Sequence, residues 1–413
     1  MLPRRSSWST RARAPLALLA FASLSATGCA AARRLAGTDT VNLEKAEIQS
    51  MSVDIRRQAK TICPREPVQM AVFADIVLVG DKAPKPVETW HGRGSVNKND
   101  KLDFADFAFH SEQGSFDRDG WFSPNPSLLA TANKELEIKS VYRRRPDKFS
   151  FTTSYKPDYG CIREGGSGGN PGRDGPSGSD GSSGKSGSSG SSSSSGGDGG
   201  DGGNGTSGGN AGDGAPGPRL SVYATLVKTA FYERLVAIVI DGDKRDFLLV
   251  PEGQTIAIHA IGGAGGTGGH GGDGGSGGSG GSGNPGGKGG RGGQGGSGGN
   301  GGNGGPGGAI EYVYDASHPE LKGALQLVVA GGSGGPAGSA GRAGSGGSAG
   351  SATSPSSTGN GPPPPPAKAG TAGPDGASGS SGSSGRSGPD GRSNDAPGAV
   401  KDKFAGHPEI TVL

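Results

Sequence analysis

Apolar and polar residues alternate, or form short apolar runs, at several places in the first third of the chain. Clusters of Pro, Gly, Asn and Asp separate these runs, which is typical of short strands joined by turns. The expected strands are residues 69–79, 102–109, 134–142 and 148–155. This pattern predicts a small all-β domain over residues 45–163, with a β-sandwich-like arrangement.

A second set of strand-like runs lies beyond residue 217 and is interrupted by glycine-rich sequence. Asp241-Gly242 between two of the runs indicates a hairpin. The expected strands are residues 219–228, 231–240, 245–250, 254–261, 310–314, 324–330 and 409–413. We expect residues 218–261, 309–330 and 394–413 to form one β head.

Between these runs the chain is periodic in glycine. Glycine occupies nearly every third position of residues 166–217 and of the third block, 331–393, while residues 262–308 repeat as Gly-Gly-X. The whole chain has 87 Gly and 29 Pro in 413 residues. A single conventional core over the full length is excluded, because the repeats carry too little apolar surface to offset their ordering entropy.

Each glycine block is broken near its middle, by Ser191–Ser195, by Asn284-Pro285 and by residues 353–369. The halves are nearly equal in length, which predicts six arms that leave the head, turn and return. The turns are the candidate contact sites, namely Ser191, Ser195, Asn284, Pro285, Pro362 and Pro366.

Glycine at every third position suits a left-handed helix with three residues per turn, rising about 3.1 Å per residue, so that each arm would be about 70 Å long. This helix has no internal hydrogen bonds, and its backbone groups must pair with neighbours. A Gly-Gly-X arm can be approached along two edges, so the 262–308 arms should be central. Two alternatives stay open: a collagen-like trimer and flexible linkers.

Local motifs add a resemblance over residues 165–413. Val250-Pro251-Glu252-Gly253 precedes one glycine run, and Gly301–Gly308 leads into Ala309–Asp315. This half resembles the Obg-type glycine-rich fold of a GTPase family and polyglycine II helix bundles, which also occur in an antifreeze protein and in phage adhesin tips. The resemblance is to the glycine-rich fold alone, so nucleotide chemistry is not implied. The whole chain resembles uncharacterised glycine-rich, collagen-like bacterial lipoproteins.

The N-terminus carries a targeting pattern. Residues 1–28 combine four arginines with a short apolar stretch, and Ser25–Cys29 resembles a lipobox. This resemblance implies lipid on Cys29, a tether over residues 29–44 and, because residue 30 is Ala, sorting to the outer membrane. The alternative is an ordinary secretory signal cut near Ala32.

Charge and cysteine content agree with an exported protein. With four of the 41 basic residues in residues 1–28, 37 basic and 38 acidic residues remain, which argues against a nucleic-acid partner. Of the three cysteines, lipidation accounts for Cys29, and Cys63 and Cys161 are the expected disulfide in an oxidising compartment.

The sequence contains no readable catalytic arrangement. Gly184-Lys185-Ser186 lacks the preceding glycine of a phosphate-binding loop, and the histidines show no metal-ligand spacing. We therefore expect no enzymatic activity, no cofactor and no metal. The expected function is a lipid-anchored structural or adhesive protein of the outer membrane, a monomer that meets a protein or glycan partner at its tips. The alternatives are an envelope ligand-binding module on the first β domain and a collagen-like trimeric stalk.

Overall fold

The computed structural model describes residues 40–56, 59–89, 101–355 and 366–413. The fold is all-β: strands dominate, and the helices among the described residues are short 3-10 turns. The chain forms two compact units, described separately below: the first runs to Cys161 and includes Thr229–Phe231, and the second contains the rest.

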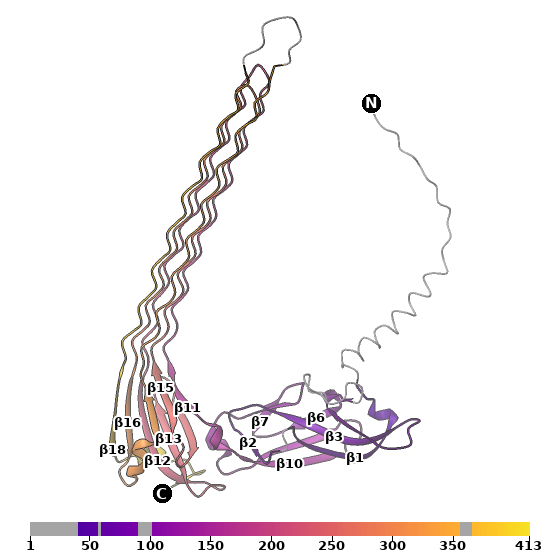
Figure 1. The fold of residues 1–413 in the computed structure, drawn as a ribbon. Coiled ribbons are helices and arrows are strands. Elements are labelled where there is room, and N and C mark those ends of the chain that lie inside the picture. The colour runs from indigo at the N-terminus through magenta and orange to yellow at the C-terminus, as the bar shows by residue number, and fades with distance from the viewer. Residues whose placement is uncertain (1–39, 57–58, 90–100, 356–365) are drawn as a thin grey trace, which may run out of the picture. The chain divides into compact units, whose positions relative to one another are not determined.

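The first unit contains two sheets (Figure 1). One has the order β5-β4-β3-β8-β7, with β1 also paired to β3, and the other has the order β2-β10-β9-β6. The strands are β1 (Ala46–Ile55), β2 (Thr61–Ile62), β3 (Val68–Leu78), β4 (Lys85–Thr89), β5 (Lys101–Leu102), β6 (Phe107–His110), β7 (Gly114–Phe116), β8 (Trp121–Pro124), β9 (Leu136–Tyr142) and β10 (Ser150–Pro157). The short helices are η1 (Leu43–Lys45), η2 (Phe104–Asp106), η3 (Leu128–Thr131) and η4 (Tyr159–Cys161).

One apolar core joins both sheets of this unit. Its buried side chains include Met70 and Ile76 from β3 and Ile138 from β9, all with no exposed surface. Val41 and Leu43, which fall within the expected tether, are also buried in this core. Since Val41 and Leu43 pack in the core, the folded unit begins before residue 45, the start predicted from the sequence.

The predicted strand 102–109 is wrong as a single element. The chain there forms β5, then η2, then β6. The Asp103 carboxylate accepts a hydrogen bond from the Ala105 N–H (2.9 Å), which caps η2 and interrupts the extended chain. The longest pairing of this unit, β1 with β3, was missed at the sequence level.

The second unit begins with a head of two sheets. The smaller has three parallel strands in the order β11-β15-β17, and the larger has the order β14-β13-β12-β16-β18, with β19 also on β12. The strands are β11 (Glu164–Gly168), β12 (Arg219–Lys228), β13 (Leu235–Asp241), β14 (Asp246–Pro251), β15 (Ile256–Ile261), β16 (Ala309–Asp315), β17 (Leu325–Val328), β18 (Arg392–Gly398) and β19 (Thr411–Val412), with helices η5 (Pro319–Gly323) and η6 (Lys401–Phe404).

The head is built on strands that are apolar on both faces. All of β13 up to Ile240 is buried, as are Leu248, Leu249 and Val250 of β14. The hairpin expected at Asp241-Gly242 is present, since β13 and β14 pair antiparallel. Asp315 at the end of β16 is also buried, and it accepts hydrogen bonds from the Thr225 hydroxyl (2.8 Å) and the Ser317 N–H (2.9 Å).

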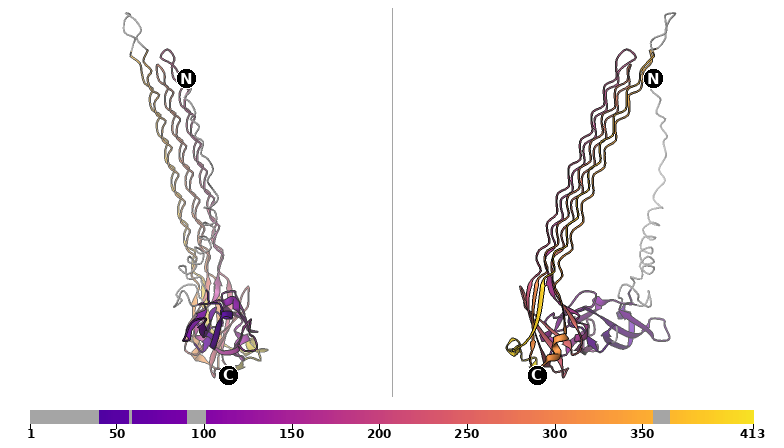
Figure 2. Two further views of the ribbon diagram at one scale, coloured as in Figure 1. Left: turned by 90° about the vertical axis from the view of Figure 1, so that its right-hand side faces the viewer. Right: turned by 60° about the vertical axis from the view of Figure 1, so that its left-hand side comes forward.

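Six glycine-rich arms extend from the head and lie side by side in every view (Figures 1 and 2). We number them in chain order as arm 1 (169–190), arm 2 (196–217), arm 3 (262–283), arm 4 (286–308), arm 5 (331–352) and arm 6 (370–391). Hydrogen bonds between arms define two layers, arms 1, 3 and 5 running outward and arms 2, 4 and 6 returning.

Each layer of arms continues a sheet of the head. β11, β15 and β17 lead into arms 1, 3 and 5, while arms 2, 4 and 6 lead into β12, β16 and β18. The register is carried over unchanged. Glu164 pairs with Ala257 in the sheet, and Asp174 bonds to Thr267 in the arms, in both cases 93 residues apart.

Candidate functional site: the distal end of the arms

Glycine positions set how closely the arms approach. A Cβ on Gly275 of arm 3 would overlap the carbonyl oxygen of Ser182 in arm 1, and one on Gly293 of arm 4 would overlap that of Gly203 in arm 2. The overlapping atoms are backbone and cannot rotate away. Glycine is therefore required at these contacts for steric reasons.

The central arms use both glycine N–H groups of every triplet as donors. In the triplet 271–273 of arm 3, the three N–H groups donate to the Ser339 carbonyl (2.9 Å), the Thr206 carbonyl (2.9 Å) and the Asp180 carboxylate (2.8 Å). Arms 3 and 4 each bond to four other arms, the central position that the Gly-Gly-X repeat predicts. The backbone groups that an extended arm cannot satisfy alone are thus paired with neighbouring arms, both within a layer and between the two layers.

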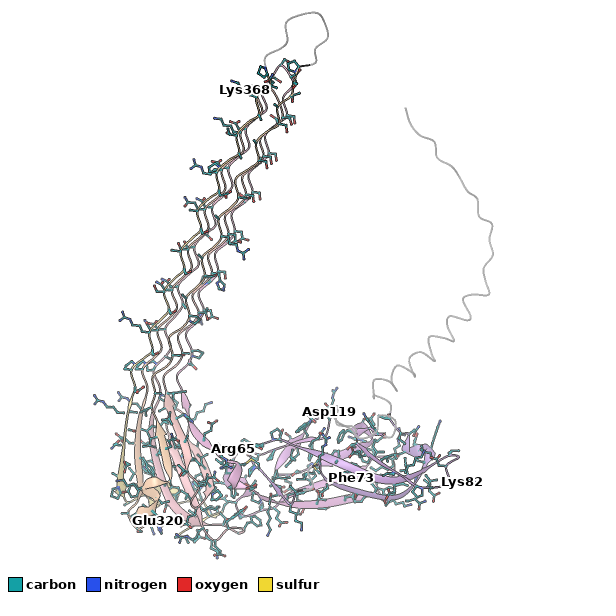
Figure 3. All side chains as sticks on the ribbon, in the orientation of Figure 1. Arg65, Phe73, Lys82, Asp119, Glu320 and Lys368 are labelled. Carbon is teal, nitrogen blue, oxygen red and sulfur yellow. A yellow bond between two sulfur atoms is a disulfide. The ribbon has the colours of Figure 1, made fainter. Side chains whose placement is uncertain are left out.

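Asp and Asn side chains cap further backbone N–H groups, a role that was missed at the sequence level. Their side-chain oxygens accept from backbone N–H groups of the adjacent arm at 2.6 to 3.0 Å. The signal was present as Asp198, Asp201, Asn204, Asn210 and Asp213, which recur at multiples of three in arm 2. Side chains stand out from the arms at regular intervals (Figure 3).

The first two turns meet at the distal end. The Asn284 N–H donates to the Ser194 carbonyl (2.9 Å), and the Gly196 N–H donates to the Pro285 carbonyl (2.9 Å). Ser191 closes the first turn through its contacts with Ser194, and the exposed Ser195 ends it. The structure therefore brings together Ser191, Ser195, Asn284 and Pro285.

The third turn starts and ends at the distal end, beside the first two turns. The Thr353 N–H donates to the Gly283 carbonyl (2.8 Å), and the Lys368 carbonyl accepts from Gly286 (2.8 Å). Figure 3 shows Lys368 at this distal end and Glu320 at the head. Pro366 is exposed beside Lys368, and Pro362 lies outside the described residues.

The outward layer is rich in hydroxyl groups near these turns. The registers between arms 1, 3 and 5 place serine at the same level in three successive rows: Ser183, Ser276 and Ser345; Ser186, Ser279 and Ser348; Ser189, Ser282 and Ser351. Ser345 and Ser276 are hydrogen-bonded through their hydroxyls (3.3 Å). The distal part of this face is polar and uncharged.

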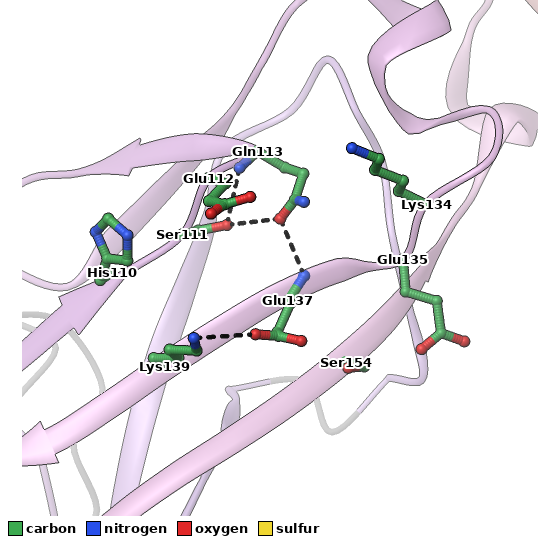
Figure 4. Close-up of a pocket in the computed structure, with 9 residues that line it drawn as sticks. All are labelled: His110, Ser111, Glu112, Gln113, Lys134, Glu135, Glu137, Lys139 and Ser154. Atoms are coloured by element: carbon green, nitrogen blue, oxygen red, sulfur yellow. Dashed lines mark hydrogen bonds and ion pairs between the residues drawn. The ribbon is translucent and has the colours of Figure 1, made fainter. Parts of the chain in front are cut away.

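The first unit holds the expected disulfide and a polar hollow. Cys63 and Cys161 are bonded, with Cα atoms 6.0 Å apart, as predicted. The hollow, about 350 Å³, is lined by residues of the β6–β7 turn and of β9 (Figure 4). Lys139 pairs with Glu137 there at 3.6 Å, with both side chains about half exposed. A solvent-exposed ion pair of this kind contributes little to stability.

The described part of the chain also bears on metal binding and membrane spanning. No group of three metal-binding side chains is found there. None of its helices is long and apolar enough to span a bilayer. Cys29 lies outside the described residues.

Comparisons with known proteins give no match. No protein-family model, curated protein or solved structure matches the chain. Its function therefore has to be inferred from the residues and their geometry.

Proposed function

We propose that this chain is a lipid-anchored outer-membrane protein with a structural or adhesive function. In this proposal it presents a rigid bundle of polyglycine II helices whose distal turns make the contact. The observation that carries the proposal is the convergence of the turns, through the Asn284–Ser194 and Thr353–Gly283 bonds. Three segments far apart in sequence thereby form one small exposed surface.

The geometry of the arms supports the polyglycine II assignment. They have the glycine period of a three-residue helix, and their hydrogen bonds run to neighbouring arms at 2.6 to 3.1 Å. These bonds lie within one chain, which favours a monomer over the collagen-like trimer. Light scattering on residues 30–413 should give the mass of one chain, and three times that mass would favour the trimer.

The anchor rests on the lipobox resemblance at Cys29. Mass spectrometry of the N-terminal peptide should find acyl chains on Cys29, and Cys29→Ala should move the protein out of the membrane fraction. An unmodified N-terminus near Ala32 would instead indicate an ordinary secretory signal.

Adhesion by the tips is tested with charge substitutions that leave the turns intact. Ser195 and Pro366 are exposed, and the hydrogen bonds of the first turn involve Ser191, Ser193 and Ser194 rather than the Ser195 side chain. Beads carrying residues 30–413 would be retained on dextran-coated or gelatin-coated glass, as a glycan and a protein surface. Ser195→Glu with Pro366→Glu should reduce retention.

The control is Ser333→Glu, an exposed position at the base of arm 5. It adds one negative charge far from the turns, where the tip variant adds two at the turns, and should leave retention unchanged. Equal retention of tip and base variants would contradict adhesion by the tips and favour the ligand-binding alternative in the first unit.

A further inference from the structure

An aromatic groove opens between the two sheets of the first unit. It lies along β6 and β7, which are the last strands of their respective sheets and are joined by residues 111–113. Its volume is about 560 Å³, within the range of small-molecule pockets. We call it the β6–β7 groove; the side chains that matter here are Phe104, Phe107, Phe109, Phe116, Arg118 and Arg143.

The phenylalanines form a continuous, preformed floor. The Phe116 ring lies 5.4 Å from Phe109 and 4.9 Å from Phe122, and Phe109 lies 6.2 Å from Phe104. Phe104 and Phe107 are buried, whereas Phe109 and Phe116 are only half-buried and so reach the groove. A Cβ on Gly120 would overlap the Phe104 ring, so the chain leaves room for this aromatic packing.

Two arginines complete the groove with positive charge. The Arg143 Nε donates to the Phe107 carbonyl (3.0 Å), which holds this guanidinium beside the aromatic floor. Arg118, in the turn after β7, is the second cation. The nearby Asp117 carboxylate accepts hydrogen bonds from the N–H groups of Asp119 (2.9 Å) and Trp121 (2.8 Å), so it serves to form the turn.

We propose that the β6–β7 groove binds an anionic amphiphile. Its acyl or aryl body would lie on the phenylalanine floor, and its carboxylate, sulfonate or phosphate head would pair with Arg118 and Arg143. Guanidinium groups suit these planar or branched anions because they present several donors in a fixed fork. The arms take no part, so this inference is independent of the function proposed above.

The probe is 8-anilinonaphthalene-1-sulfonate, which combines an aromatic body with an anionic head and fluoresces in apolar surroundings. Residues 30–413 should bind it at one site in the first unit, and laurate should displace it. Arg118→Glu should weaken binding by about tenfold or more, which corresponds to about 1.4 kcal/mol. Arg145→Glu is the control, because Arg145 is an exposed arginine of the turn between β9 and β10 that does not line the groove, and it should change affinity less than twofold.

A double variant, Arg118→Glu with Arg143→Gln, removes both cations and should weaken binding further than Arg118→Glu alone. Circular dichroism checks that the variants stay folded. The proposal would be overturned by probe binding that is insensitive to Arg118→Glu, or by no binding below millimolar probe. Displacement by neutral dodecanol as strong as that by laurate would also overturn it. The proposal would also be overturned if light scattering showed a dimer that dissociates as the probe binds, because a second copy of the chain would then occupy the groove.

Discussion

At the scale of single residues, glycine in the arms acts by leaving space rather than by flexibility. The contact partners of the central glycines are backbone carbonyls, so a methyl group there displaces a whole arm. The residues between the glycines have a different role, because Asp and Asn supply acceptors that the backbone of the neighbouring arm lacks. A repeat that looks uniform in sequence therefore contains two kinds of position with opposite tolerance to substitution.

Gly275→Ala should destabilise the arms by about 1 to 3 kcal/mol, because the new Cβ would overlap the Ser182 carbonyl. Ser276→Ala is the matched control at the next residue, which is exposed, and should change stability by less than about 0.5 kcal/mol. Amide hydrogen exchange at Gly203 and Gly293 measures both effects. Equal exchange in the two variants would contradict the steric role of glycine.

The buried Asp315 predicts a pH dependence of the head. Burial alone raises the pKa of Asp315, but hydrogen bonds from Ser317 and Thr225 outweigh it and hold the pKa below its usual range. A carboxyl group with a lowered pKa in the folded state contributes stability above its unfolded pKa of about 3.9, and this contribution is lost as the pH falls through the folded pKa.

Thermal denaturation from pH 6 downward should therefore show the head losing stability below about pH 4. Asp315→Asn should lower the melting temperature near neutral pH and flatten this loss. If the slope below pH 4 is the same in the variant and the parent, Asp315 is not its source.

At the scale of elements, strand register determines how the arms align. β12 pairs with β16 and β16 with β18 at separations of 90 and 83 residues, and the same separations recur between arms 2, 4 and 6. The head thus works as a template, since pairing of its apolar strands sets which glycine faces which carbonyl. Each arm inherits its alignment from the strand that it continues.

An insertion in arm 1 tests this template. One extra glycine after Gly172 should displace every later glycine of the arm from its contact and expose the amides of arm 1 to exchange. Three extra residues, Ser-Ser-Gly, at the same place should keep glycine at the contacts and lengthen the turn at Ser191–Ser195. Protection from hydrogen exchange along residues 175–190 should therefore be lost with one residue and kept with three; the reverse order would contradict register control.

At the scale of the whole molecule, the two units have separate means of stabilisation. The first has an apolar core and the Cys63–Cys161 bond, which closes a loop over 98 positions. The second has the apolar head and the hydrogen-bonded arms. Their unfolding should therefore respond to different substitutions.

Cys63→Ser with Cys161→Ser should destabilise the first unit by about 2 to 5 kcal/mol, because the open chain gains entropy on unfolding. Scanning calorimetry should show one transition moved to lower temperature and the other unchanged. A matched loss in both transitions would mean that the units unfold together.

The sequence by itself determined the all-β class, the disulfide, the glycine period and the division of each block into two arms. These features are local or periodic, and residue type is enough to specify them. Glycine spacing predicted the central position of residues 262–308 because contact on two edges requires glycine at two positions of each triplet. The interruption of 102–109 by η2 was missed, because the Asp103 cap competes locally with an apolar run that reads as a strand.

Only the tertiary structure decided the strand order of the head, the layering of the arms and the meeting of the turns. It also decided the β6–β7 groove, which forms where two edge strands from different sheets come together. The layering of the arms depends on pairing between segments 69 to 93 residues apart. Many such pairings are compatible with a repeating sequence, and only the packing of the apolar strands selects one of them.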